Sequence, residues 1–341
     1  MDLFEKYVKN PKVYIGLASA FLLWMGRKYF NGPWTPIKKS MANKTVIITG
    51  CNSGIGLKTA EDLLSQGALV IFACRDEKRT KEAIETLPSD SQKRAIFIKL
   101  DLCDFNSVNL FAQEFRKLHK SIRIDILINN AGAFNFEFQL SKDNIEVNMQ
   151  ANHFGHKVLT FLLFDLMDKK EARIINVASK GHYFVHESDF KKLISSVEFK
   201  GDNFNGHSVY LNSKLANIFF TQHLAEICEN KYPYVKTACL HPGSILTEIG
   251  RNFSWFLKGL MTVLHPIIWY ISKSVSAGAQ TTLYLCYEDF EKFHNGDYYK
   301  DCKRAQISDF AKNLENRVEF TKWSYLALDK ALAGKFELPK I

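Results

Sequence analysis

The 341-residue sequence lacks several patterns that would assign it to common classes of protein. Its seven cysteines contain no Cys-x-x-Cys pair and are odd in number, so we expect free thiols in a reducing compartment. There is no His-Glu-x-x-His zinc motif, and we interpret His182 and His186 as ordinary loop histidines despite their helical spacing. Ser179 lacks the Gly-x-Ser-x-Gly turn of serine hydrolases. We therefore expect neither a metal site nor Ser-His-Asp hydrolysis.

Positive charge is abundant, but it is not distributed as nucleic-acid binding requires. The net charge is +9, and residues 1–45 alone carry eight basic and two acidic side chains. The remaining residues form no basic stripe that could follow a phosphate backbone. Basic residues beside an apolar segment instead favour anionic lipid headgroups. We therefore expect a membrane partner and no nucleic acid.

The N-terminal apolar run is short for a membrane span. A helix over Val13–Met25 rises only about 20 Å, against roughly 30 Å for the hydrocarbon core of a bilayer. A retained anchor, tilted or inserted in one leaflet, is preferred to a signal-peptide core or a buried helix. Because Arg27 and Lys28 follow the run, we expect the rest of the chain to face the cytosol. The endoplasmic reticulum or a lipid droplet is the expected site, with a mitochondrial membrane as the alternative.

Two prolines in residues 31–36 end this region, and a different pattern follows. Short apolar runs alternate with amphipathic stretches such as Val108–His119 and Lys214–Glu229, which predicts a parallel sheet covered on both faces. We thus predict an anchor and linker over residues 1–40, and a single doubly wound Rossmann-type α/β domain over residues 41–341. The expected strands are Thr45–Thr49, Ala68–Cys74, Ala95–Leu100, Ile124–Ile128, Arg173–Val177 and Val235–Leu240.

A glycine-rich loop follows the first expected strand. It has the sequence Thr-Gly-Cys-Asn-Ser-Gly-Ile-Gly over residues 49–56 and precedes a helical stretch. Glycine lets the backbone approach a pyrophosphate, and the amides of a helix N-terminus favour an anion. A turn without a ligand could have the same composition, but the position after the first strand favours a nucleotide site. The candidate ligands are Gly50, Asn52, Ser53, Gly54, Ile55 and Gly56.

Tyr210 and Lys214 form a candidate acid–base pair. A phenol has a pKa of about 10 and is a poor proton donor or acceptor at neutral pH. Four residues apart on a helix, the two side chains share one face, where an ammonium favours the phenolate and lowers that pKa. Such a pair alone is most often a surface feature. Ser179, at the end of the fifth strand, and Asn152, in the helical stretch before it, complete the candidate set.

Together these motifs resemble the short-chain dehydrogenase/reductase family. The glycine spacing is Thr-Gly-x-x-x-Gly-x-Gly, Asp101-Leu102 follows the third strand, and Asn-Asn-Ala-Gly follows the fourth at residues 129–132. Each motif is weak alone, but their order over roughly residues 40 to 330 is specific. The catalytic tetrad of that family occurs in its usual chain order as Asn152, Ser179, Tyr210 and Lys214.

The resemblance implies a role for each residue. Tyr210 would exchange a proton with the substrate oxygen, which Ser179 would hold in line. Lys214 would lower the pKa of Tyr210 and bind the nicotinamide ribose, and Asn152 would steady a water in the proton path. The other implied cofactor contacts are Asp101 and Leu102 near the adenine, Asn130, Ala131 and Gly132 along the cleft, and Pro242, Gly243 and Thr247 near the nicotinamide.

The end of the second strand bears on the choice of nucleotide. A guanidinium suits phosphate, so Arg75 favours the 2′-phosphate of NADP(H). Asp76 could instead bind the ribose 2′-hydroxyl of NAD(H). Related enzymes often have a basic residue directly after Gly-Ile-Gly, but here Leu57 occupies that position and Lys58 comes next. NADP(H) is the expected cofactor, with NAD(H) as the alternative.

Shorter motifs resemble the retinol dehydrogenase branch of the family. They lie at residues 73–76, 152–156, 241–243, 278–281 and 298–303. The resemblance to this branch implies an N-terminal membrane anchor and the oxidation or reduction of retinoids and other lipid aldehydes. Two departures are Ala178 before Ser179, and an extra loop around Phe190–Asn205 that could reshape substrate entry. The apolar segment Phe253–Ile271 is expected to form a substrate lid, with packed core or a partner interface as the alternative.

Two hypotheses of different class follow. The first is an NADP(H)-dependent oxidoreductase that transfers a hydride between nicotinamide and a lipophilic alcohol or carbonyl compound, with Tyr210 as the acid or base. The second is a non-catalytic accessory subunit of a larger membrane assembly that retains the fold. Every residue that catalysis needs is present, which favours the enzyme. The resemblance also allows a homodimer.

Overall fold

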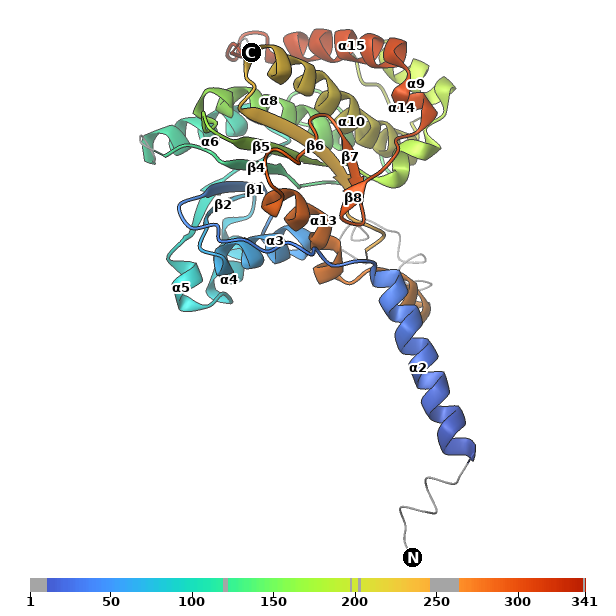
Figure 1. Ribbon diagram of the computed structural model, residues 1–341. Helices are drawn as coiled ribbons and strands as arrows, with labels where there is room; N and C mark the ends of the chain where they lie inside the picture. Colours follow the sequence, from blue (N-terminus) through green and yellow to red (C-terminus); the bar gives the residue numbers. More distant parts are fainter. Residues whose placement is uncertain (1–10, 119–121, 197, 202–203, 246–263, 340) are drawn as a thin grey trace, which may run out of the picture.

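One sheet forms the centre of the protein. The computed structural model describes residues 11–118, 122–196, 198–201, 204–245, 264–339 and 341. Within them, eight strands run in the order β3-β2-β1-β4-β5-β6-β7-β8, and only β8 is antiparallel to its neighbour (Figure 1). This confirms the predicted Rossmann-type α/β fold. The strands are β1 Thr45–Thr49, β2 Leu69–Cys74, β3 Ala95–Lys99, β4 Ile126–Asn129, β5 Ala172–Val177, β6 Val235–His241, β7 Tyr298–Lys300 and β8 Lys303–Arg304.

Helices cover both faces of the sheet, because its strands are apolar on both sides. In β1, Val46 and Ile48 belong to the core beneath α3 and α13, whereas Ile47 belongs to the core on the opposite face, beneath α6, α8, α10 and α15 (Figure 1). Successive strand residues point to opposite faces, so a continuously apolar strand must be covered twice. These helices are α3 Gly54–Ser65, α6 Phe105–Leu118, α8 Gly155–Leu163, α10 Gly206–Lys231, α13 Val275–Tyr287 and α15 Leu314–Leu332.

Shorter elements connect these layers. The short α-helices are α4 Glu77–Glu85, α5 Ser89–Gln92, α7 Val147–Met149, α9 Glu187–Ile194, α12 His265–Ile271 and α14 Asp309–Lys312. The π-helix η1 covers Gln150–Phe154, and the 3₁₀ helices η2 and η3 cover Phe164–Leu166 and Lys180–Phe184.

The strand order determines where a ligand can bind. From β1, the chain passes first to β2 and β3 on one side, and later to β4 and the following strands on the other. Crossovers that leave in opposite directions open a crevice at the carboxyl ends of β1 and β4. The glycine-rich loop follows β1 and residues 129–132 follow β4, so both motifs lie at this crevice.

The strand predictions agree with the structure to within two residues at each end. Strands β7 and β8 are not predicted, because so few residues carry no recognisable periodicity. The helix predicted from Lys214 begins earlier, at Gly206, where the Asn205 side chain caps it by accepting a hydrogen bond from Ser208 N–H. Part of the predicted extra loop, from Phe190 onwards, is the second half of α9.

The predicted anchor forms the middle of a longer helix, α2 (Pro11–Asn31), which projects from the body of the protein (Figure 1). Its apolar side chains are exposed; Leu17 and Leu22 are 64% and 67% accessible. None of the helices in the described ranges combines the length and hydropathy that crossing a bilayer requires. Of the predicted lid, residues 253–263 lie outside the described residues. The rest forms α12, which has no buried residue and so is not packed core.

Lys157 is an unusual component of the core between α8 and α15. It is 2% exposed, and its ammonium donates to Ser324 Oγ at 2.8 Å and lies 3.7 Å from the centre of the Tyr325 ring. Burial lowers the pKa of Lys157 to about 7, although Asp329 acts in the opposite direction. Buried His153, on η1, also contacts Ser324 and adds no negative charge.

We predict that Lys157→Met stabilises the protein at pH 7 by about 1–3 kcal/mol. An unfolded lysine has a pKa of about 10.4, so between about pH 7 and 10 the unfolded chain binds a proton that the native side chain does not. The native contribution of Lys157 therefore becomes more favourable as the pH rises through this window. Urea denaturation at pH 7 and 9 should show a smaller rise in stability for Lys157→Met than for wild type. Exposed Lys81→Met is the control, and an equal rise in all three proteins would contradict the assignment.

Candidate active site

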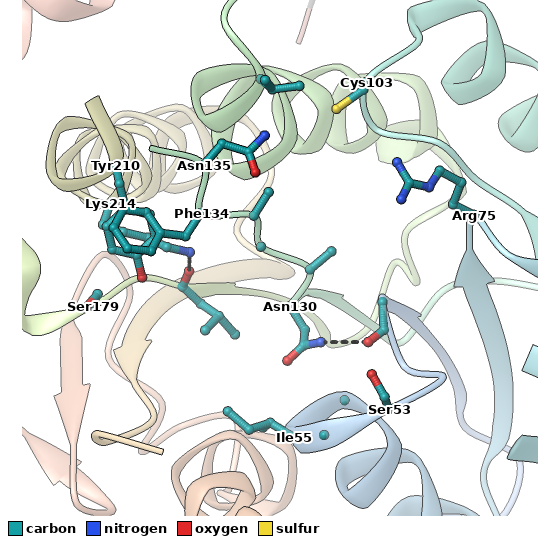
Figure 2. Close-up of a pocket in the computed structure, with 18 of the residues that line it drawn as sticks. Ser53, Ile55, Arg75, Cys103, Asn130, Phe134, Asn135, Ser179, Tyr210 and Lys214 are labelled. Carbon is teal, nitrogen blue, oxygen red and sulfur yellow. Dashed lines mark hydrogen bonds between the residues drawn. The ribbon is translucent and has the colours of Figure 1, made fainter. Parts of the chain in front are cut away.

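A pocket of about 1410 Å³ opens at the carboxyl ends of β1, β4, β5 and β6. Figure 2 shows Arg75 and Ser53 on one side of it, and Ser179, Tyr210 and Lys214 on the other. The structure therefore brings the glycine-rich loop and the candidate acid–base pair into one cavity. The predicted site residues that line it are Gly50, Asn52, Ser53, Gly54, Ile55, Gly56, Arg75, Asp101, Asn130, Ala131, Gly132, Ser179, Tyr210, Lys214, Pro242 and Gly243.

The glycine-rich loop has no room for side chains at two positions. Gly50 has a φ of +65°, and a Cβ there would lie 2.9 Å from Ala131 Cβ. A Cβ on Gly56 would lie 2.6 Å from both Gly50 O and Asn130 Nδ2. Glycine thus allows the loop to pack closely while the first turn of α3 opens onto the pocket. This geometry fits a bound pyrophosphate.

Thr49, which the sequence analysis did not single out, joins this loop to the end of β4. Its hydroxyl oxygen accepts hydrogen bonds from Asn130 N–H and Ala131 N–H, both at 2.9 Å. Asn130 Nδ2 donates to Thr49 O at 2.9 Å, and His156 Nε2 lies 2.8 Å from the Thr49 hydroxyl. Neighbouring Asn129 donates to Asn176 Oδ1 at 2.8 Å and so ties β4 to β5. The Asn-Asn-Ala-Gly motif therefore supports the sheet and lines the pocket.

The two candidate determinants of nucleotide choice have different surroundings. Arg75 lines the pocket, and its guanidinium points into it (Figure 2). The Asp76 side chain instead caps α4, where Oδ1 accepts a hydrogen bond from Arg79 N–H at 3.0 Å. Asp76 is absent from the lining of the pocket, and so is Lys58, which pairs with Glu61 at 2.6 Å. Arg75 is thus the predicted determinant that faces the cavity.

Of the two residues predicted near the adenine, Asp101 faces the pocket and Leu102 does not. Asp101 lines the pocket, and its Oδ1 accepts a hydrogen bond from Cys103 N–H at 3.0 Å. Leu102 is 8% exposed and belongs to the core; its carbonyl oxygen accepts from Gln150 Nε2 at 3.1 Å. Cys103 lines the pocket next to Asp101, a position that the sequence analysis did not identify, and burial raises the pKa of its thiol to about 12.

Helix α10 presents Tyr210 and Lys214 to the pocket on one face. The Lys214 ammonium donates to Val177 O at 3.2 Å, and this carbonyl also accepts from Asn217 Nδ2 at 3.3 Å. The ammonium lies 5.8 Å from the centre of the Tyr210 ring. Burial lowers the pKa of Lys214 to about 8. The predicted pairing of these two side chains on one helix face is present.

The expected effect of Lys214 on Tyr210 is absent from this arrangement. Burial raises the pKa of Tyr210 above its usual value, and a hydrogen bond with Ser179 acts in the opposite direction. The Lys214 ammonium donates to Val177 O, and burial and the Ser179 hydrogen bond account for the pKa of Tyr210 in this arrangement. The lowered pKa that we predicted for Tyr210 is therefore not present in this arrangement.

Asn152 lies on the π-helix η1, behind the pocket rather than in its lining, and is fully buried. Its Oδ1 accepts from Ala133 N–H at 2.7 Å, and its Nδ2 donates to Ala133 O at 3.0 Å and to Ser213 Oγ at 2.9 Å. Ser213 lies next to Lys214 on α10. In this structure Asn152 thus holds the chain that follows Gly132, beside the other three tetrad residues.

The loop after β6 closes the pocket. Gly243 has a φ of +104°, and a Cβ there would overlap the side chain of Lys273. Lys273 pairs with Asp301 at 2.6 Å. Thr247, the remaining predicted cofactor contact, lies outside the described residues. Pro242 and Gly243 thus line the pocket, on a loop that packs closely against Lys273.

His182 makes a local contact in the turn after β5. Its Nδ1 lies 2.7 Å from Ser179 O, at the start of η3. Across the described part of the chain, no group of three or more His, Cys, Asp or Glu side chains is arranged to hold a metal ion.

A second set of lining residues was not predicted. They follow Gly132 in the chain. Phenylalanine occurs there at every second position, and this alternation is the feature of the sequence that could have identified them. The set is Ala133, Phe134, Asn135, Phe136, Glu137, Phe138, Gln139, Leu140, Ser141 and Lys142.

Comparison with known proteins identifies the family. A family model described as short chain dehydrogenase matches residues 44–186. Retinol dehydrogenase 14 of Mus musculus is 35% identical over 319 residues, covering 88% of this chain and 92% of its own. Retinol dehydrogenase 12 of Homo sapiens is 33% identical over 309 residues, covering 88% and 93%. The chain belongs to the short-chain dehydrogenase/reductase family, whose members are oxidoreductases that use nicotinamide cofactors, and it resembles the retinol dehydrogenases within it.

Solved structures share the fold. An uncharacterised protein from Mycobacterium paratuberculosis superposes with a TM-score of 0.69 at 25% identity, covering 91% of this chain and all of its own. An NADPH-bound carbonyl reductase from chicken fatty liver superposes with a TM-score of 0.58 at 19% identity, covering 79% of this chain and all of its own.

Proposed function

We propose that the protein is an NADP(H)-dependent oxidoreductase acting on a lipophilic alcohol or carbonyl compound, with Tyr210 as the acid or base. One observation carries the proposal: Tyr210 and Lys214 face the same cavity as the glycine-rich loop, with Ser179 beside the phenol. The relatives named retinol dehydrogenases support a lipid-like substrate. No observation favours the accessory-subunit alternative.

Each residue of the pocket has a definable task. The glycine-rich loop and the first turn of α3 would hold the pyrophosphate, and Lys214 would bind the ribose next to the nicotinamide. When bound, a nicotinamide nucleotide would supply or accept the hydride. Tyr210 moves the proton at the substrate oxygen, and Ser179 donates a hydrogen bond that fixes this oxygen and stabilises its developing charge.

The raised pKa of Tyr210 suits one direction of the reaction. A protonated phenol at neutral pH can donate to a carbonyl oxygen as it gains charge, which is what reduction requires. Oxidation needs the phenolate, and a cation that moves closer to the hydroxyl would favour it. A phenol that is protonated near pH 7 therefore fits reduction, which is the direction that we propose.

We predict that Tyr210→Phe lowers the rate of NADPH-dependent carbonyl reduction by at least about 100-fold, because the proton donor is lost. NADPH affinity should stay within about twofold of wild type, since the phenol is not needed to hold the pyrophosphate. Stopped-flow reduction of retinal measures the first quantity and calorimetry the second. Tyr234→Phe, outside the pocket, is the matched control. Full turnover by Tyr210→Phe would refute the assignment.

The preference for NADP(H) rests on Arg75. Its guanidinium points into the pocket, whereas the rival carboxylate of Asp76 is occupied as the cap of α4. Charge-assisted hydrogen bonds from Arg to a phosphate are strong and have the right planar geometry. Two of the similar solved structures contain NADPH or NADP, in a carbonyl reductase and in a dehydrogenase from Burkholderia cenocepacia.

We predict that Arg75→Met lowers the ratio of kcat/KM with NADPH to kcat/KM with NADH by about ten- to a hundredfold, the value of a charge-assisted hydrogen bond. The loss should appear in KM for NADPH, with kcat nearly unchanged. Lys58→Met should leave the ratio unaltered, since Lys58 pairs with Glu61 outside the pocket. An unchanged ratio in Arg75→Met would refute Arg75 as the determinant of nucleotide choice.

We also propose that α2 and α12 bind a membrane surface, with the catalytic body on its cytosolic side. Trp269 and Ile267 on α12 are 51% and 60% exposed, and they extend the apolar surface of α2. The two helices are held together by Arg27, whose guanidinium donates to Ser272 O at 2.6 Å and lies 4.7 Å from the centre of the Trp269 ring. Tyr270 OH adds a hydrogen bond to Leu23 O at 3.0 Å. Basic residues beside this surface suit anionic headgroups.

We predict that the double variant Leu17→Asp and Leu22→Asp abolishes flotation with vesicles of phosphatidylcholine and phosphatidylserine. Burying a charge in the acyl region is unfavourable, while an exposed helix tolerates it in water. The matched control carries Leu110→Asp and Leu326→Asp, two equally exposed leucines on the body. Flotation of the α2 variant at the wild-type level would exclude this surface.

A further inference from the structure

The segment after Gly132 is held by two asparagine side chains, only one of which belongs to the tetrad. Asn152 makes a pair of hydrogen bonds with the main chain of Ala133. Four residues earlier, Asn148 on α7 makes the same pair with Asn135: its Oδ1 accepts from Asn135 N–H at 2.8 Å, and its Nδ2 donates to Asn135 O at 3.0 Å. Both side chains are fully buried.

The spacing of these two amides matches the segment that they hold. Four residues of helix rise about 6 Å, and two residues of extended chain span about 6.6 Å. Asn148 and Asn152 can therefore bond to alternate residues of an extended segment, as a neighbouring strand would. Asn148 is itself fixed, because its Nδ2 also donates to buried Glu146 Oε1 at 2.9 Å.

The residue between the two anchored positions is Phe134, and it lines the pocket next to the phenol (Figure 2). Its ring centre lies 4.6 Å from that of Tyr210, with an angle of 50° between the planes. The ring of Phe136 lies 4.6 Å from Phe134 on another side. Gly206, at the start of α10, packs so closely on Asn135 O and Phe136 that a Cβ there would overlap them. The segment is thus confined between Asn148 and the helix that carries Tyr210.

We propose that Phe134 determines substrate specificity by contacting the group next to the reacting oxygen, and that Asn148 is a positioning residue that fixes Phe134 through the main chain of Asn135. This inference rests on the proposed oxidoreductase function. An aromatic face beside the phenol favours a flat, conjugated group next to the carbonyl over a saturated chain. The expected substrate class is therefore conjugated or aromatic aldehydes and their alcohols.

The test compares two aldehydes of similar size, cinnamaldehyde and nonanal, with NADPH as the reductant. Wild type should have the higher kcat/KM for cinnamaldehyde. Phe134→Leu should lower the cinnamaldehyde-to-nonanal ratio by about three- to tenfold, the value of one aromatic contact, mainly through KM. Phe336→Leu, at a partly buried position outside the pocket, is the matched control and should keep the wild-type ratio.

Asn148 is tested by Asn148→Leu and, because a buried substitution can impair folding, by the smaller polar variant Asn148→Ser. Both should lower the ratio toward that of Phe134→Leu while NADPH affinity stays unchanged. In the double variant Phe134→Leu and Asn148→Ser, the ratio should fall no further than in Phe134→Leu alone. The reason is that both changes remove the same interaction, the contact of Phe134 with the substrate. Additive effects would show that Asn148 acts elsewhere and would overturn its positioning role.

The outcomes separate this inference from the function on which it rests. If wild type reduces both aldehydes and Phe134→Leu retains the wild-type ratio, the inference on Phe134 is wrong and the oxidoreductase proposal stands. If wild type binds NADPH but reduces neither these aldehydes nor retinal, both proposals fall.

Discussion

The hydrogen bonds of Thr49 hold together the two strand ends on which the site is built. The hydroxyl oxygen accepts from the main-chain N–H groups of Asn130 and Ala131, and the Asn130 side chain also donates to Thr49 O. These bonds bring the glycine-rich loop after β1 against the turn after β4, so closely that Gly50 has no room for a side chain. The shape of the nucleotide-binding half of the pocket, and the start of the segment that leads to Phe134, both follow from this junction.

The acid–base half depends on burial as much as on charge. The Lys214 ammonium is buried and donates to the main-chain carbonyl of Val177, and burial lowers its pKa to about 8. Burial also raises the pKa of Tyr210. Groups with perturbed pKa values that converge in a cavity are typical of active sites. Lys157 shows the same effect of burial outside the pocket, where its ammonium donates to the Ser324 hydroxyl and lies over the Tyr325 ring.

The fold could be predicted because the strands are continuously apolar and alternate with amphipathic helices. The N-terminal helix is longer than its apolar run, because the helical conformation of the main chain continues through the polar residues Arg27 and Lys28 to Asn31. The tetrad could be placed from motif order, but the pKa of Tyr210 could not, because burial raises it and burial cannot be read from residue spacing. Asp76 accepts a hydrogen bond from Arg79 N–H at the start of α4, and Asn148 accepts one from Asn135 N–H. Residue spacing alone does not identify these hydrogen-bond partners. A local sequence carries little information about such side-chain to main-chain bonds.

The hydrogen bonds of Asn148 and Asn152 to residues 133–135 have a consequence for how such a pocket can change over evolutionary time. The hydrogen bonds of Asn148 and Asn152 to Ala133 and Asn135 use main-chain atoms, which every amino acid except proline supplies in full. The side chain at position 134 can therefore change while the hydrogen bonds that hold the main chain on either side of it are kept. A lineage could exchange this single side chain and acquire a new preference without rebuilding the catalytic framework behind it.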